Sequence, residues 1–334
     1  MRKADFENLL LVLNKQQPNR RTLYEFIVSG SLVEHVNGKL PEGADSDAYW
    51  SWLTDGYAKI GYDCVHLHAS GFHFKSGEHE HLSTKSLNDN PQIVDWDSFE
   101  QYTWNEPEDF ESNLKNAKLP EGMKAFVAGP CGLLENTIAL AGYDNICVML
   151  YEDPKLAKTI FDSVGERLYR YYAAEVANPK VGGLMINDDM GFKTQPMISP
   201  AQLREYVFPW HKKYVELAHR ENKPALLHAC GNLLEVYDDI IDDIKFDGKH
   251  SFEDVIQPVE EAYEMLNPRI TVLGGIDLDF LCRETPENIK KRCNAMFERC
   301  ESRGGYALGT GNSTPYYLPA ESFFAMCNTI YEGK

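Results

Sequence analysis

Short apolar runs alternate with longer amphipathic stretches along most of this chain. The runs are rich in Val, Ile, Leu and aromatic residues, and each ends at Gly, Asp, His or Asn, which is typical of buried strands followed by turns. The candidate strands are residues 22–28, 63–69, 124–130, 181–188, 224–230, 246–251, 269–277 and 304–311. The pattern therefore predicts eight strands.

The connecting stretches predict helices at residues 153–177, 199–222, 233–244 and 285–303. The first of these opens on Asp153-Pro154, a favourable cap and first-turn pair, and repeats apolar residues every three or four positions. The second contains Pro209, which lacks an amide hydrogen and so predicts a kink or a break. Strands and helices are therefore expected to alternate.

Eight strands joined by helical crossovers in 334 residues favour an α/β fold of the (β/α)8 TIM barrel type, formed as a single domain over residues 1–334. We expect an N-terminal helical extension within residues 1–20. A long β2α2 insertion at residues 70–123 is expected over the catalytic face. Neither a G-x-G-x-x-G nor a P-loop motif follows a predicted strand. The chain therefore lacks the phosphate-binding loops that nucleotide-binding α/β folds need.

The composition excludes several classes of protein. The hydrophobic content of 43% can supply a large core, and no apolar stretch is long enough for a membrane span or a signal peptide, so a cytoplasmic location is expected. The eight cysteines have no compact framework spacing, which indicates reduced thiols. A net charge of −18 argues against nucleic acid and anionic membrane surfaces as partners.

The sequence HACGN places His228 and Cys230 at the end of a predicted strand. Side chains two positions apart on a strand share a face, and active sites of (β/α)8 barrels lie at the carboxyl ends of the strands. Imidazole and thiolate are both good ligands for zinc. Taken alone, the H-x-C pattern also fits a buried thiol beside a hydrogen-bonded imidazole, and both interpretations stay open at this point.

Other predicted strand ends also carry polar side chains. They bring Tyr24, Glu25, Asp188, Asp189, His250, Asp277, Thr310 and Asn312 toward the same end of the barrel. Adjacent residues on a strand point to opposite faces, so at most one of Asp188 and Asp189 can face the pocket, and the pair could instead cap the following helix or turn. Polar residues thus converge where this architecture places chemistry.

The motif HACGN, together with NDDMGFKTQPMISP and KHSFEDVIQPVEEAYE, resembles the uroporphyrinogen decarboxylase superfamily, and most closely its branch of corrinoid-dependent methyltransferases. This resemblance implies a (β/α)8 barrel, a zinc ion held by His228 and Cys230, a corrinoid carried by a partner protein, and a homodimer. It also implies a difference from true decarboxylases, whose N-terminal R-x-x-G-R segment is absent here.

One departure concerns the last strand. The sequence LGTGNS places Thr310 at this position. Decarboxylases have the histidine of an L-G-H-G motif there, and zinc methyltransferases have a cysteine that is the third zinc ligand. A third ligand then has to come from elsewhere, and Asp189, His250 and Glu253 are the candidates.

We therefore expect zinc-dependent methyl transfer between a corrinoid protein and a small methyl donor or thiol acceptor. Asp188, Asp189 and His250 are the expected catalytic residues, with Asp188 or Asp189 moving the proton. The residues expected to bind substrate are Tyr24, Glu25, Asp277, Thr310 and Asn312. Two alternatives remain: a cofactor-free decarboxylase, and a non-catalytic barrel that binds a ligand or a corrinoid protein.

Overall fold

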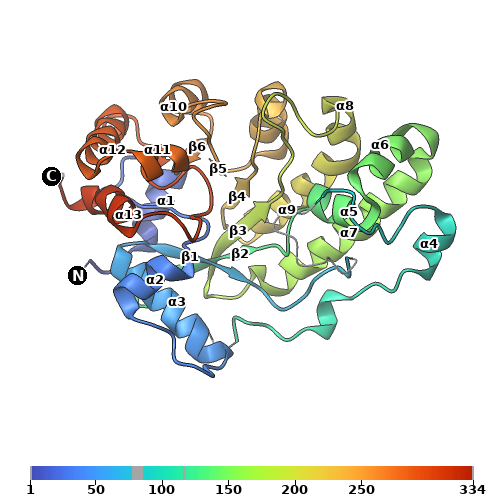
Figure 1. Ribbon diagram of the computed structural model, residues 1–334, viewed down its shortest axis with the longest axis horizontal. Coiled ribbons are helices and arrows are strands. Elements are labelled where there is room, and N and C mark those ends of the chain that lie inside the picture. The colour runs from blue at the N-terminus through green and yellow to red at the C-terminus, as the bar shows by residue number, and fades with distance from the viewer. Residues whose placement is uncertain (1, 77–85, 116, 333–334) are drawn as a thin grey trace.

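The structure, a computed structural model, describes residues 2–76, 86–115 and 117–332. One curled parallel sheet lies at its centre, with its strands in chain order (Figure 1). The strands are β1 (Cys64–His68), β2 (Lys124–Ala128), β3 (Val181–Asn187), β4 (Ala225–His228), β5 (Gly248–His250), β6 (Thr271–Leu273) and β7 (Tyr306–Ala307). Seven of the eight predicted strands are therefore confirmed, in a barrel-like sheet.

The predicted strand at residues 22–28 is wrong in its extent. It is reduced to an isolated parallel bridge between Leu23 and Leu308 beside β7. Further along, the backbone amides of Val28 and Ser29 donate to the side-chain hydroxyls of Tyr57 and Thr314 instead of to a neighbouring strand. The backbone of Thr22 and Tyr24 pairs with Leu308, and the amides of Val28 and Ser29 are used by side chains, so the pairing does not extend to the end of the predicted strand.

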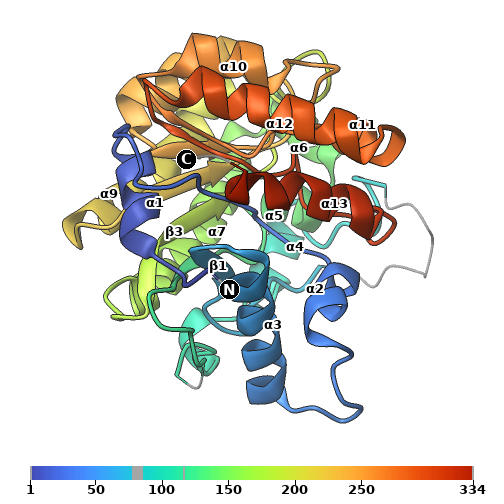
Figure 2. The same ribbon diagram turned by 90° about the vertical axis from the view of Figure 1, so that its left-hand side faces the viewer.

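Helices cover the outer face of the sheet and its ends. They are α1 (Phe6–Leu13), α2 (Gly30–Asn37), α3 (Ser46–Ile60), α4 (Trp96–Gln101), α5 (Leu133–Ala141), α6 (Tyr143–Glu152), α7 (Pro154–Val176), α8 (Pro200–Gln202), α9 (Phe208–Arg220), α10 (Val259–Leu266), α11 (Leu278–Arg283), α12 (Pro286–Cys300) and α13 (Ala320–Cys327). Both views show α12 and α13 side by side (Figure 2). Among the described residues, no helix combines the length and apolarity that crossing a bilayer needs.

The predicted helices differ in outcome. The cap at Asp153 is confirmed, since its side chain accepts from the amide of Leu156 at the start of α7. Near Pro209 the helix is not broken: helical backbone continues from α8 to α9 through a π-helical turn, Leu203–Val207, so the predicted disturbance takes the form of a change in helix type just before the proline. The helix predicted at residues 233–244 is confirmed as one helical stretch of mixed type: a 3-10 turn, Leu234–Val236, continues through Tyr237 and Asp238 into a π-helical segment, Asp239–Ile244.

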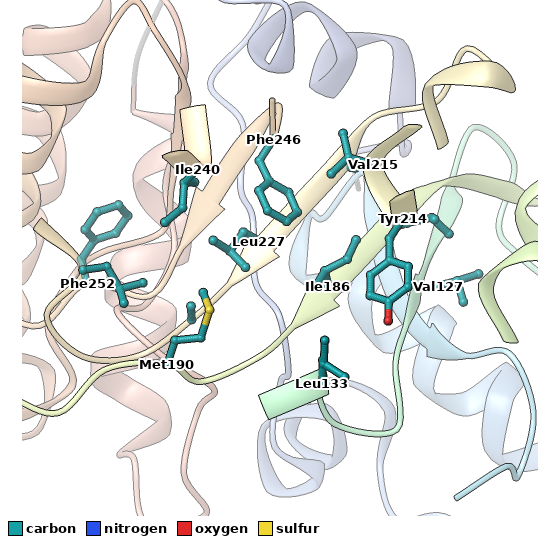
Figure 3. Packing of buried hydrophobic residues seen from close by; sticks show 14 of the residues in the cluster. Val127, Leu133, Ile186, Met190, Tyr214, Val215, Leu227, Ile240, Phe246 and Phe252 are labelled. Atoms are coloured by element: carbon teal, nitrogen blue, oxygen red, sulfur yellow. The ribbon is translucent and has the colours of Figure 1, made fainter. Parts of the chain in front are cut away.

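Side chains alternate between the two faces of the sheet. On the outer face, Ile186 and Leu227 pack near Tyr214 and Val215 of α9 (Figure 3). Inside the curled sheet, a second apolar cluster includes Phe126, Met185 and Leu226, and α1 contributes to it with Phe6, Leu9, Val12 and Leu13. Since Thr271 at the start of β6 donates to the carbonyl of Val12, α1 lies at the amino ends of the strands. The opposite end is left for chemistry.

The connection from β1 to β2 includes α4 and a 3-10 turn, Pro107–Asp109. It corresponds to the insertion predicted at residues 70–123, of which residues 77–85 and 116 lie outside the described residues.

Candidate metal centre

Three potential metal ligands meet at the carboxyl ends of β3 and β4. His228 is the last residue of β4, Cys230 follows two positions later, and Asp189 follows β3. His228 Nε2 lies 3.6 Å from Cys230 Sγ and 3.8 Å from Asp189 Oδ1. The three ligand atoms all lie within 4.8 Å of one another. One imidazole, one thiolate and one carboxylate form a donor set that suits zinc.

Two loops in direct contact hold this arrangement. Gly231 has a φ of 85°, and a Cβ added there would lie 2.1 Å from the carbonyl oxygen of Gly191. The amide of Gly191 donates to the carbonyl of Cys230, and the amide of Cys230 donates to Asp189 Oδ1 at 2.8 Å. The glycine of HACGN is therefore needed for the β3 loop to bring its carboxylate to the thiol.

A chain of hydrogen bonds fixes the imidazole of His228. His250 Nε2 lies 3.2 Å from the carbonyl oxygen of Thr310, which can only accept, so this nitrogen carries a hydrogen. His250 Nδ1 is then the acceptor in its 2.7 Å contact with His228 Nδ1. His228 consequently donates from Nδ1 and presents the lone pair of Nε2 to Asp189 and Cys230. This is the tautomer that a metal ligand requires.

The sulfur of Cys230 is also held by donors. Ser251 Oγ lies 3.4 Å and Asn312 Nδ2 lies 3.2 Å from Sγ. Burial, together with the nearby Asp189, raises the pKa of the Cys230 thiol to about 12. A divalent cation would reverse that effect, because coordination deprotonates a thiol. The residues present therefore fit a zinc ion.

Of the three candidates for the third ligand, the structure places Asp189 beside the His-Cys pair. His250 uses both ring nitrogens in other contacts, and Glu253 lines a separate cavity. Asp188 faces the other way: it is buried, and it accepts from the amide of Leu134 at the start of α5 and lies 2.8 Å from His211 Nε2. Asp188 is thus a capping residue, but of α5, which precedes it in the chain, and not of the following helix or turn as the alternative had it, while Asp189 faces the pocket.

A cavity of about 900 Å³ adjoins the centre. Asp189 and Glu135 line it, and its wall contains the aromatic residues Trp50, Phe72, Phe74 and Phe192. No lysine or arginine occurs among the lining residues that the structure describes. Burial, with the nearby charges of Asp188 and Asp189, raises the pKa of Glu135 to about 8. Glu135 was not singled out in the sequence, where its only signal is its place three residues after the cap of a helix that follows a strand.

None of the residues predicted to bind substrate is among the described lining residues of the cavity beside the centre. Tyr24 is buried inside the barrel, and Asn312 contacts the sulfur of Cys230. Asp277 caps α11 through the amide of Phe280 and lines the second cavity with Glu253. Their contact with a substrate stays a prediction.

Glu25 and Thr310 form a buried pair. Thr310 Oγ1 lies 2.8 Å from Glu25 Oε1 and also contacts the carbonyl oxygen of Asn312. The hydroxyl of Thr310 has only one hydrogen. When it donates that hydrogen to the Asn312 carbonyl, the hydrogen bond between Thr310 and Glu25 needs a hydrogen on the Glu25 carboxyl. A protonated Glu25 agrees with its burial, which raises its pKa to about 8.

Sequence comparison places the chain in a family. Residues 117–333 match the family model described as uroporphyrinogen decarboxylase (URO-D), which spans well over half of the chain and includes His228 and Cys230. The chain belongs to the URO-D family. No curated protein sequence matches the chain significantly.

One solved structure shows the fold of this URO-D family member. A methyltransferase from Methanosarcina mazei superimposes with a TM-score of 0.70 at 18% sequence identity, covering 97% of this chain and 97% of that chain. A protein from Listeria monocytogenes assigned as a vitamin-B12-independent methionine synthase gives a TM-score of 0.46 at 12% identity, covering 94% of this chain and 98% of that chain. The first of these confirms the barrel-like architecture.

Proposed function

We propose that this URO-D family member is a zinc-dependent methyltransferase that moves a methyl group between a small substrate and a corrinoid carried by a partner protein. The observation that carries the proposal is the convergence of Asp189, His228 and Cys230 beside a cavity of about 900 Å³. The shared fold with a methyltransferase supports it.

A zinc ion bound by these three residues would supply a Lewis acid that polarises the heteroatom bonded to the methyl group, or that lowers the pKa of a thiol acceptor. His250 fixes the ligating tautomer of His228, and Ser251 and Asn312 hold the sulfur of Cys230. These contacts make the donor set rigid before substrate arrives.

Glu135 is the proton donor in this proposal. It lines the same cavity as Asp189, and its raised pKa keeps it protonated at neutral pH. When the methyl group leaves an ether or amine substrate for the corrinoid, the Glu135 carboxyl gives its proton to the heteroatom that remains. The aromatic side chains of the wall surround the methylated group and exclude water.

The cavity also weighs against a decarboxylase of porphyrinogens. Such a substrate carries several carboxylates and needs fixed cationic groups. The described lining residues contain no lysine or arginine. These lining residues therefore offer no fixed cation to the carboxylates of a porphyrinogen.

The direct test is methyl transfer to free cob(I)alamin from a panel of methyl ethers, methylamines and methyl thioethers, followed by the absorbance of the cobalt product. We expect turnover with zinc-loaded protein, loss of turnover in Cys230→Ala, and a large loss in Glu135→Gln with metal content unchanged. Release of carbon dioxide from uroporphyrinogen by metal-free protein would instead support the decarboxylase alternative.

A further inference from the structure

Lys249 is a buried cation next to the candidate metal centre, and neither the proposed mechanism nor the barrel core uses it. It is 1% exposed and lies in β5 between Gly248 and His250. A charged side chain is rarely buried without a partner of opposite charge, because desolvation is costly.

The contacts of Lys249 contain no such partner. Its Nζ donates to the carbonyl oxygens of Ser251 at 2.5 Å, and of Ala229 and His250 at 3.4 Å. It also lies 4.2 Å from the ring centre of Phe252. Among the described residues Lys249 forms no ion pair, so carbonyl dipoles and one aromatic face are all that solvate the ammonium directly.

The carbonyls that hold it belong to the segments that carry the metal centre. Ala229 lies between His228 and Cys230, and Ser251 donates to the sulfur of Cys230. The anionic forms of Cys230 and Asp189 stabilise the ammonium of Lys249. The ammonium in turn disfavours the protonated, positively charged form of His228. Glu253 interacts with Lys249 as well, but it is partly exposed and solvent screens it.

The charges of the centre can be counted. A divalent ion, the thiolate of Cys230, the carboxylate of Asp189 and a neutral His228 sum to zero. The ammonium of Lys249 makes the local sum positive. At the low effective dielectric constant of a protein interior, a unit charge close to a site changes the affinity for another charge by about tenfold or more.

We propose that Lys249 is a positioning residue whose charge makes the Asp189–His228–Cys230 centre favour an anion at the coordination position that the protein leaves open. This role rests on the proposed metal centre. It has a consequence that a purely structural lysine does not have: removal of the charge strengthens binding of the metal cation and weakens binding of an anion to the bound metal.

The experiment uses cobalt(II) as a spectroscopic substitute for zinc, with sodium azide as the anionic probe and imidazole as the neutral probe. The variants are Lys249→Met and Lys249→Gln, of which the second retains an N–H donor for the carbonyls. Lys223→Met is the matched control, because Lys223 Nζ also donates to two backbone carbonyls, those of Val176 and Asn178, near the opposite end of β4.

We expect the Lys249 variants to bind cobalt on the order of tenfold more tightly and azide on the order of tenfold more weakly than the wild type. Imidazole affinity and the Lys223 control should not change. Folded Lys249 variants that bind both cobalt and azide more weakly, or that bind both with unchanged affinity, would overturn the role of Lys249 but not the metal centre. A wild-type protein that binds no cobalt would remove the metal centre itself, and this role with it.

Discussion

The hydrogen bond between His250 and His228 gives a prediction that separates orientation of a ligand from ligation itself. Replacing His250 with phenylalanine keeps a ring of similar size among its ring neighbours Tyr24 and His228 but removes both nitrogens. His228 Nδ1 then has no acceptor at the position where it now contacts His250 at 2.7 Å. The imidazole of His228 is free to change tautomer and to point a hydrogen at the metal position.

The expected loss of stability in His250→Phe follows from the hydrogen-bond partners that Thr310 and His228 keep. The carbonyl of Thr310 still accepts from the amide of Gly275 at 2.9 Å, so it is not left unpaired. Only one buried donor, on His228, loses its partner, at a cost of about 1–3 kcal/mol in the free energy of unfolding. Loss of an outer-shell partner typically lowers metal affinity by about 10–100-fold, which corresponds to about 1.4–2.8 kcal/mol.

The assay is zinc competition with a chromophoric chelator, together with urea unfolding of the metal-free protein. His219→Phe is the matched control, because His219 pairs with Asp247 on the partly exposed face of α9. We expect His250→Phe to fold, to bind zinc more weakly, and to lose modest stability, while the control keeps wild-type affinity. A folded His250→Phe protein with wild-type zinc affinity would refute the tautomer argument.

Three further predictions follow from the same geometry. Asp188→Ala should lower the free energy of unfolding by about 3 kcal/mol with zinc content retained, whereas Asp189→Ala should abolish zinc binding with little effect on stability, as urea unfolding and metal analysis can show. Glu25 has a pKa of about 8 in the folded protein, above its ordinary value of 4.5. Its contribution to stability is therefore complete below pH 4.5 and is lost as pH rises toward 8. Glu25→Gln should remove this decline when thermal unfolding is followed across that pH range. Gly231→Ala should weaken zinc binding, measured by chelator competition, because its Cβ would meet the Gly191 carbonyl.

Each of these has a contrary result. Equal zinc loss in Asp188→Ala and Asp189→Ala would show that the two carboxylates are not divided between cap and ligand. An unchanged pH profile in Glu25→Gln would mean that Glu25 is ionised in the folded state. Wild-type zinc affinity in Gly231→Ala would show that the contact between the two loops does not position Asp189.

The seven confirmed strands could be predicted from the sequence, because their buried apolar runs are visible in the local composition. The pattern overestimated the strand at residues 22–28, whose end is held instead by Tyr57 and Thr314, side chains that are distant in the chain and accept from the amides of Val28 and Ser29. At residues 233–244 the pattern predicted a helix correctly, but not that the helix is partly 3-10 and partly π-helical. Periodicity reports which side chains are buried, not which distant groups accept or donate hydrogen bonds.

The candidate site was predictable to a similar degree. His228 and Cys230 could be paired because strand periodicity places them on one face. The choice of Asp189 over His250 and Glu253 depended on the contact between Gly191 and Gly231, which no spacing rule gives. Glu135 and Lys249 were missed for the same reason, since their significance lies in what surrounds them after folding.

The most direct test of the central claim is the zinc content of protein purified without chelator, measured for the wild type and for Asp189→Ala, His228→Ala and Cys230→Ala. The account predicts about one zinc per chain in the wild type and a large loss in all three variants, with folding checked by circular dichroism. A wild-type protein without zinc, or zinc that persists in folded variants of all three residues, would contradict it.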